Sequence, residues 1–174
     1  MFGTAEIAGL DTGSLQADLE IIDILVEAGA VVSQMEDDTV CARKAPLEAF
    51  DADLNHAPDL FPIVSLLAAF CAGESHIAGV GRLAGKESDR ADAILTMLTQ
   101  MGVEAAIDGD VLNVCGETLS SRLVSGHLLA GGNYTSRHDH RMVMALKVAS
   151  LGADGPVVID DEACVAKSFP DFSL

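Results

Sequence analysis

One pattern of hydrophobic and polar positions occurs twice along the chain. Residues 4–41 and 74–115 each begin with a short strand pattern, EIAGL or HIAGV, and continue with an amphipathic helix. Each of these helices ends at a glycine, Gly29 or Gly102, which suits a helix C-terminus. Two short strands around an acidic turn, MEDDT or IDGD, then follow. The repeat predicts two copies of one structural unit.

Two further segments are apolar enough to be buried helices. Residues 59–73 read DLFPIVSLLAAFCAG and are apolar on every face, which is typical of a helix enclosed by other elements. Asp59 is a candidate N-cap for this helix, and Pro62 is tolerated in its first turn. Residues 139–152, DHRMVMALKVASLG, form a similar segment and precede a strand, PVVID. The predicted unit is therefore a buried helix, a strand, an amphipathic helix and two strands.

These units divide the chain unevenly. We expect a single partial domain over residues 1–174, with mixed helices and strands of the α/β (α+β) class. The first unit, about 1–58, lacks its buried helix, and the second, 59–132, is complete. The third, 133–174, breaks off after KSFPDF, where its amphipathic helix is expected. The chain thus resembles a piece of something larger.

Composition excludes several classes of function. With 174 residues and 49% hydrophobic positions the chain is long and apolar enough to form a core. A net charge of −17 opposes binding to nucleic acid or to an anionic membrane. No apolar run reaches membrane-spanning length, and the N-terminus lacks a signal-peptide pattern. Four cysteines without CxxC spacing favour a reducing cytoplasm over zinc or redox use.

Cations are scarce, so each lysine or arginine is a candidate for a specific role. The chain has 10 of them, against 27 aspartates and glutamates. Ordinary surface positions explain four of the ten: Arg43, Lys44, Arg122 and Lys147. Five of the other six, all except Arg137, lie in motifs that are considered next.

The stretch GVGRLAGKESDR, residues 79–90, has the composition of a phosphate-binding turn. A P-loop, GxxxxGK[ST], would need glycine at Val80 and serine or threonine at Glu87, so that interpretation fails. A dinucleotide fingerprint, GxGxxA, is formally met. It would need an acid at the end of the next strand, whereas Glu104 begins that strand and Asp108 comes late. The alternative is a glycine turn in which Ser88 and the acids cap a helix.

Polar residues also stand at the starts of the two apolar helices. They are NHAPD, residues 55–59, and DHR, residues 139–141. Helix N-termini offer free N–H groups and the positive end of a dipole, so these positions indicate a shared anion site. N-capping by the two aspartates is the simpler alternative and is compatible with function. His138 and His140 are spaced to share a metal ion, but no further ligand lies at a usual spacing.

The motifs NHAPD, GKESDR, DHRMVM and KSFPDF, in this order, resemble those of the 5-enolpyruvylshikimate-3-phosphate (EPSP) synthase family. SLQADLEIIDILVEAGA also resembles the family's corresponding outer helix, so the resemblance covers essentially the whole chain. It implies repeated βαβαββ units with buried helices surrounded by sheets, as in one of the family's two similar domains. It places this chain in the C-terminal domain and implies that the N-terminal domain is missing.

The resemblance also implies a reaction and a set of site residues. The family transfers enolpyruvate from phosphoenolpyruvate to the 5-hydroxyl of shikimate 3-phosphate and releases phosphate, without a cofactor or metal. It is a cytoplasmic family of aromatic amino acid biosynthesis and a glyphosate target. The implied phosphoenolpyruvate contacts are Arg90, Arg141 and Lys167. The implied shikimate 3-phosphate contacts are Asp59, Lys86 and Arg82, the last at a position where the family varies. The implied catalytic groups are Asp59 as base, with Glu87 and Lys167 as candidate acids.

Three alternatives remain for this chain alone. It is an inactive half of such an enzyme, a non-catalytic remnant that binds anions weakly, or part of a related enolpyruvyl transferase. Because the first unit lacks its buried helix, we also expect exposed apolar residues on EIAGL, on AVVSQM and on the helix of residues 59–73. That exposure predicts self-association as a symmetric homodimer.

Overall fold

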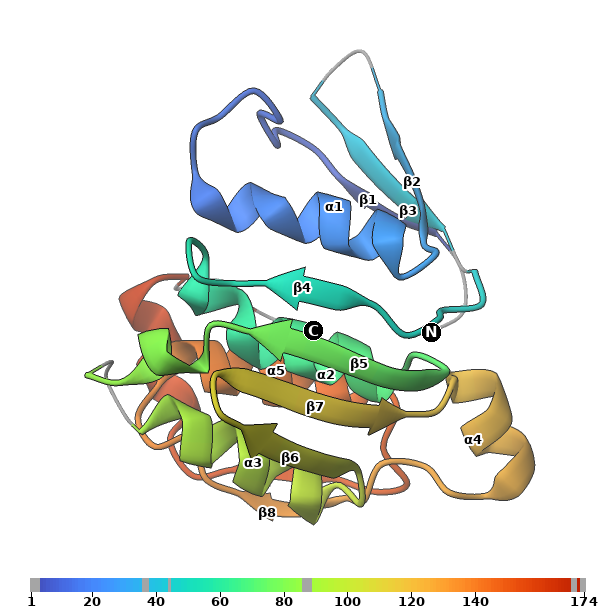
Figure 1. Cartoon of the computed structure of the whole chain (residues 1–174), viewed down its shortest axis with the longest axis vertical. Helices are drawn as coiled ribbons and strands as arrows, with labels where there is room; N and C mark the ends of the chain where they lie inside the picture. The colour runs from blue at the N-terminus through green and yellow to red at the C-terminus, as the bar shows by residue number, and fades with distance from the viewer. Residues whose placement is uncertain (1–3, 36–37, 44, 86–88, 170–171, 173–174) are drawn as a thin grey trace.

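Three β-sheets and the helices packed beside them make up the chain in a computed structural model (Figure 1). The structure describes residues 4–35, 38–43, 45–85, 89–169 and 172. Most buried hydrophobic side chains belong to one core, formed by the buried faces of the helices and the inner faces of the sheets. No described helix is long and apolar enough to cross a membrane.

The second unit contains the whole βαβαββ pattern. Its elements are β4 (Asp51–Asp53), η2 (Pro58–Leu60), α2 (Phe61–Ala69), β5 (Gly73–Ala78), η3 (Val80–Leu83), α3 (Arg90–Gln100), β6 (Glu104–Asp108) and β7 (Val111–Gly116). The strands form one sheet in the order β4-β5-β7-β6, in which β4 pairs parallel to β5 and the other pairs are antiparallel. The predicted unit was therefore incomplete, because its sheet begins with β4, upstream of residue 59.

The two helices of this unit follow the predicted periodicity. In α2, seven of nine residues are buried, as expected for a helix apolar on every face. The buried hydrophobic residues of α3 recur with helical spacing on one face. Gly102, with φ +77°, follows its C-terminus, where glycine is favoured. One prediction is wrong: Ala57 and Leu60 are the N-caps of η2 and α2, so Asp59 is not a cap and its carboxylate is used elsewhere.

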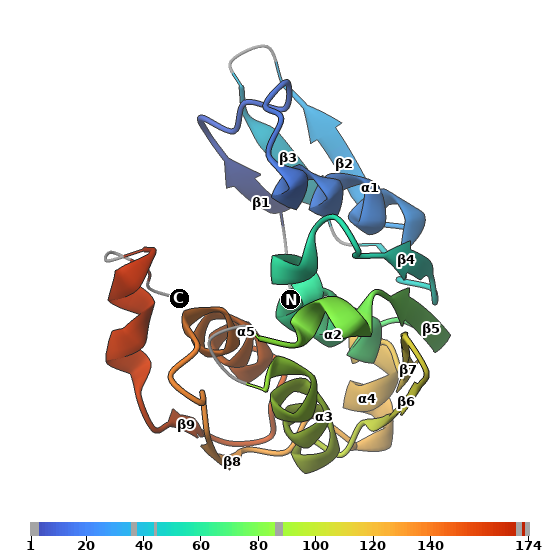
Figure 2. The ribbon, with the colours of Figure 1, turned by 60° about the vertical axis from the view of Figure 1, so that its left-hand side comes forward.

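The third unit repeats the first half of the second. α4 (Leu119–Ser125) follows β7 and leads to this unit, whose elements are β8 (Gly132–Tyr134), α5 (His140–Ser150), β9 (Val157–Ile159) and η4 (Glu162–Lys167). The buried helix α5 connects the parallel strands β8 and β9, just as α2 connects β4 and β5. The two buried helices pack against each other in the centre of the molecule (Figure 2). The predicted helix at 139–152 is confirmed.

The first unit repeats only the second half of the pattern. Its elements are β1 (Thr4–Ile7), η1 (Ala17–Leu19), α1 (Glu20–Glu27), β2 (Val31–Gln34) and β3 (Val40–Arg43). The strand order β1-β3-β2 matches the order β5-β7-β6 of the second unit. The registers also match, since Val40 pairs with both Ile7 and Gln34, and Leu112 pairs with both Ile77 and Ile107. The described part of this unit has no counterpart of α2.

Arg122 is a correction to the expected surface arginines. Its side chain is buried and lies between α4 and the end of α2. The guanidinium donates hydrogen bonds to three backbone carbonyls, those of Glu117 (3.1 Å), His127 (3.0 Å) and Ala69 (3.2 Å). Burial lowers the pKa of Arg122, and the negative charge of nearby Glu117 opposes this shift only in part. Arg122 is therefore a structural cation that closes a helix end.

Candidate functional site

Side chains from the starts of four helical segments meet in one ion-paired cluster. Asp18 lies in η1, Asp59 in η2, Arg90 at the start of α3, and Asp139 and Arg141 at the start of α5. We call these five residues the arginine–aspartate cluster. The sequence prediction that polar residues at the starts of the apolar helices share one place is confirmed for Asp59 and Arg141.

Arg90 is the buried centre of this cluster. Its side chain is 2% exposed, and Nε donates to Oδ2 of Asp139 at 2.8 Å while Nη1 donates to Oδ1 of Asp59 at 2.7 Å. Burial disfavours the charged guanidinium, but the hydrogen bonds to the two carboxylates outweigh it and raise the pKa of Arg90. Asp89 caps α3 by accepting a hydrogen bond from the Asp92 N–H at 3.2 Å, which fixes the first turn that carries Arg90.

Arg141 lies on the outer side of Asp59. Its Nη2 is 3.1 Å from Oδ2 of Asp59, and its Nη1 donates to Oδ2 of Asp18 at 3.3 Å. The carboxylate of Asp59 therefore bridges two guanidiniums from different units. Asp139 is the N-cap of α5, as predicted, because its Oδ1 accepts from the Arg141 N–H at 3.0 Å. One aspartate thus fixes both the helix start and the buried arginine.

Two other predicted site residues lie near this cluster. Lys167 ends η4, which packs on α5, and its Nζ is 3.5 Å from the carbonyl oxygen of His138, just before the N-cap of α5. Arg82 is exposed on η3, which packs against the η2 segment that carries Asp59. Lys86 and Glu87 lie outside the described residues, as does the proposed cap Ser88.

The glycine turn after β5 has a structural explanation. Gly79 has φ +103°, and a Cβ there would lie 2.9 Å from the backbone N of Asn55. The N–H of Gly81 donates to Oδ1 of Asp110 at 2.6 Å. β5 is followed by the 3-10 helix η3, and its neighbour β7 is antiparallel, whereas a dinucleotide fingerprint joins a parallel strand directly to an α-helix. The glycines therefore allow two backbone segments to approach closely.

In the histidine pair at the start of α5, His138 pairs with a carboxylate. Nδ1 of His138 lies 2.7 Å from Oδ2 of Asp161, at the start of η4. Arg137 and His138 have positive φ angles of 54° and 60°, which turn the chain into α5. Among the described residues, no group of three or more histidines, cysteines, aspartates or glutamates is arranged to hold a metal ion.

Sequence reasoning missed Asp18 as a member of the cluster. It lies 123 residues from Arg141 in the chain, and an acid before an amphipathic helix ordinarily indicates capping. The only signal was its position at the start of a helix, a feature that it shares with Asp59 and Asp139. The cluster as a whole holds two guanidiniums rigidly at the N-terminal ends of helices. Such an arrangement suits the binding of carboxylate or phosphate groups.

Solved structures share this fold. EPSP synthase from Acinetobacter baumannii superposes with a TM-score of 0.72 at 24% identity, and the match covers 96% of this chain and 39% of that chain. The enolpyruvyl transferase NikO from Streptomyces tendae superposes with a TM-score of 0.60 at 20% identity, covering 87% and 32%. The likeness confirms the predicted fold class of βαβαββ units with buried helices.

Sequence comparison identifies the family. The sequence model of EPSP synthase (3-phosphoshikimate 1-carboxyvinyltransferase) matches residues 2–173, and the chain belongs to this family. A 3-phosphoshikimate 1-carboxyvinyltransferase of Methanocorpusculum labreanum is 39% identical over 171 residues, which are 98% of this chain and 38% of the relative. The protein of the same name from Aeropyrum pernix is 38% identical with the same coverage. The chain thus spans about two-fifths of the length of these relatives.

Proposed function

We propose that this chain supplies the phosphoenolpyruvate-binding part of an EPSP synthase active site. The observation that carries the proposal is the bridging of Arg90 and Arg141 by Asp59, at the N-terminal ends of helices. Phosphoenolpyruvate carries a carboxylate and a phosphate, and arginine binds both groups with two parallel hydrogen bonds. Family membership supports the same assignment. Lys167, at the edge of the same helix start, is the proposed third contact.

The proposed reaction is addition followed by elimination. The 5-hydroxyl oxygen of shikimate 3-phosphate bonds to C2 of phosphoenolpyruvate, its proton passes to a base, and the methylene carbon takes a proton from an acid. The C2–O bond to phosphate then breaks, and a methyl proton is lost to restore the double bond. Asp59 is the proposed base, and Lys167 and Glu87 are the proposed acids. Lys86, Arg82 and Asp59 are the proposed contacts to shikimate 3-phosphate. No cofactor or metal is needed for these steps.

The proposed partners of the chain are small anions and the rest of a longer enzyme. A net charge of −17 supports the absence of nucleic acid and anionic membranes from this list, and a cytoplasmic location is part of the proposal. Because catalysis requires groups that converge from two domains, the chain alone is proposed to be inactive. The second candidate is a non-catalytic domain that binds anions weakly, favoured by the three carboxylates that already pair with the two arginines.

A chimaera separates the two candidates. This chain would replace the 171 matched residues of the Methanocorpusculum labreanum relative, and phosphate release from phosphoenolpyruvate and shikimate 3-phosphate would be measured. We expect turnover from the chimaera and none from the chain alone. Arg141→Ala should sharply raise the KM for phosphoenolpyruvate. Arg137→Ala, which removes an exposed arginine paired with Asp92, should not raise it. A folded chimaera without turnover would favour the non-catalytic candidate.

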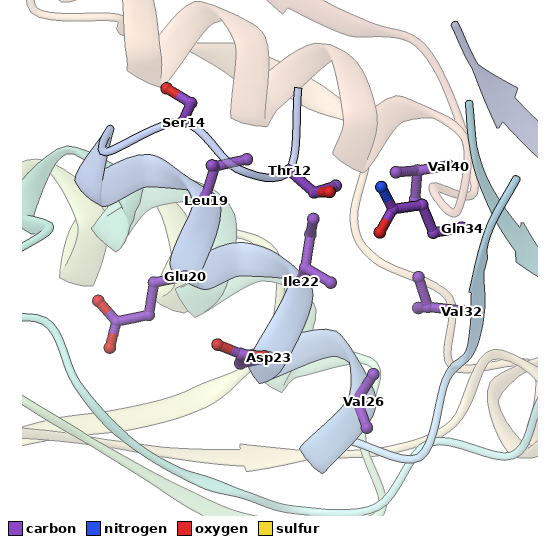
Figure 3. A pocket seen from close by; sticks show the side chains of 10 residues that line it. All are labelled: Thr12, Ser14, Leu19, Glu20, Ile22, Asp23, Val26, Val32, Gln34 and Val40. Atoms are coloured by element: carbon purple, nitrogen blue, oxygen red, sulfur yellow. The ribbon is translucent and has the colours of Figure 1, made fainter. Parts of the chain in front are cut away.

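We also propose that the chain self-associates through its first unit. In the second unit, Ile77 and Leu112 are fully or almost fully buried under the helices, but Ile7, which matches Ile77 by register, is 57% exposed. A cavity of about 520 Å³ lies between α1 and the β1-β3-β2 sheet, and apolar side chains line it from both sides (Figure 3). The predicted exposure of α2 is wrong, since α2 is buried, whereas the exposed apolar side chains of the first unit include Ile7 on β1, Val26 on α1 and Val31 on β2.

A second copy of the chain is the proposed occupant of this face. Burying one isoleucine or valine side chain contributes about 1.5–3 kcal/mol, and a symmetric contact doubles each contribution. Sedimentation velocity at micromolar concentration should detect a dimer that Ile7→Asp abolishes. Val158→Asp is the matched control, because Val158 is similarly exposed, at 52%, on β9. A monomeric wild-type chain, or equal loss in both variants, would contradict the proposal.

A further inference from the structure

The geometry points to Asp18 as a carboxylate that occupies Arg141 in the absence of an anion and that an incoming anion displaces. This inference rests on the proposed binding of phosphoenolpyruvate at Arg141, and it adds a competing group from the first unit. Nη1 of Arg141 donates to Oδ2 of Asp18 at 3.3 Å, so the guanidinium edge that would face a ligand already carries a carboxylate. Asp18 is therefore an intramolecular competitor.

The charge balance of the cluster favours such a displacement. The arginine–aspartate cluster contains three carboxylates and two guanidiniums, so its formal charge is −1. A ligand with two or more negative charges is repelled by a site of that charge, because like charges at contact distance repel each other strongly where burial reduces solvent screening. Removing one carboxylate from the guanidiniums brings the remaining four groups to neutrality. The ligand then takes the vacated hydrogen-bonding edge of Arg141.

Asp18 is the member of the cluster best placed to leave. Asp139 is completely buried and serves two partners, the Arg90 side chain and the Arg141 N–H. Asp59 is 33% exposed and bridges both arginines, at 2.7 and 3.1 Å. Asp18 is 45% exposed and makes the longest of the four ion pairs of the cluster, at 3.3 Å. Water can solvate the released Asp18 carboxylate, whereas release of Asp139 would leave a charge buried.

Displacement of Asp18 would also affect residues outside the cluster. Asp18 lies in η1, which leads directly into α1, while Arg141 lies in the first turn of α5. The ion pair thus connects the first unit to the third, and an anion on Arg141 breaks this connection. Binding at the cluster should therefore be reported by the backbone of η1, which carries no other residue of the cluster.

The experiment is a titration of the full 174-residue chain with phosphoenolpyruvate, and separately with inorganic phosphate, followed by amide NMR. Amide NMR can measure weak binding, and we expect a dissociation constant of about 1 mM for a partial site. Asp18→Asn removes the competing charge and keeps the size of the side chain. Asp23→Asn is the matched control, because it removes one exposed negative charge from the neighbouring α1. Arg141→Ala reports whether binding uses the proposed site.

We expect Asp18→Asn to bind phosphoenolpyruvate roughly two- to fivefold more tightly than wild type, the range that an exposed ion pair supports. Asp23→Asn should change affinity much less. In wild type the η1 amides should shift on binding, and in Asp18→Asn they should be shifted already before ligand is added. Unchanged or weaker binding by Asp18→Asn, in a chain whose binding is lost in Arg141→Ala, would overturn the inference and leave the proposed function intact. Binding that Arg141→Ala does not affect would overturn both.

Discussion

Replacement of Arg90 by methionine tests the buried half of the site. The guanidinium is 2% exposed and pairs with Asp139, which is completely buried, and with the more accessible Asp59. Methionine keeps much of the apolar volume but removes every donor. Asp139 then keeps a charge in the core, where its Oδ1 still accepts a hydrogen bond from the Arg141 N–H at 3.0 Å. The variant thus separates the effect of an uncompensated charge from that of a cavity.

The expected loss is large because only one partner of a buried pair is removed. Such changes cost about 3–5 kcal/mol. For a chain of this length, 1 kcal/mol corresponds to a shift of about 2–4 °C in Tm, so a decrease of roughly 6–20 °C is expected. Adding Asp139→Asn should recover part of the loss, since the neutral amide needs no counter-charge and its oxygen still caps α5. The coupling between the two changes should be about 1–3 kcal/mol.

The assay is urea unfolding followed by far-ultraviolet circular dichroism, with linear extrapolation to zero denaturant. Arg137→Met is the control, because Arg137 is 41% exposed and pairs with the exposed Asp92. It should cost less than about 1 kcal/mol. A loss below that value for Arg90→Met, or no coupling with Asp139→Asn, would refute the assignment of a buried ion pair at the centre of the site.

Three further predictions concern groups outside this pair. Arg122→Met leaves three carbonyls without a charged donor and should destabilise the chain by about 2–4 kcal/mol in the same assay. The hydrogen bond from the Ser136 N–H, and after it those from side chains, lower the pKa of Asp160 to about 2 from 3.8. The stability that Asp160 adds to the fold is therefore present above pH 3.8 and is lost as the pH falls toward 2. Wild type and Asp160→Asn should therefore differ by about 1 kcal/mol at pH 5, after allowance for solvent screening, and converge near pH 2; an equal gap at both pH values would contradict this. Burial raises the pKa of Cys71 to about 12, so iodoacetamide should label it at neutral pH only after unfolding, and labelling of the native chain at the rate of exposed Cys115 would disprove its burial.

The long apolar and periodic segments could be predicted from the sequence, and the short polar ones could not. α2 is apolar around its whole circumference and α5 over most of its length, so burial was the most stable placement for both. β4 reads DAD and is a strand only because β5 offers it a parallel edge, which no local pattern reveals. α4, with the sequence LSSRLVS, is short and polar, and its burial of Arg122 depends on carbonyls at the end of α2.

The site was predicted in outline because its motifs stand at helix starts. Asp59 and Arg141 come together as their positions at the starts of apolar helices indicated, and Arg90 joins them from the start of the amphipathic helix α3. Asp59 was expected to cap its own helix, but two guanidiniums compete for the carboxylate and form stronger, charge-assisted hydrogen bonds. Asp18 could not be assigned, because its partner is brought near only by the packing of the first unit against the third.

The most direct test of the proposed anion site is the arginine side-chain NMR spectrum of the chain during titration with phosphoenolpyruvate. Arg90 and Arg141 share the Asp59 carboxylate, so a ligand on one changes the hydrogen bonds of the other. The account predicts that their Nε–Hε resonances shift together along one saturable curve, while exposed Arg43 and Arg137 do not follow it. Shifts confined to the exposed arginines, or independent curves for Arg90 and Arg141, would contradict it.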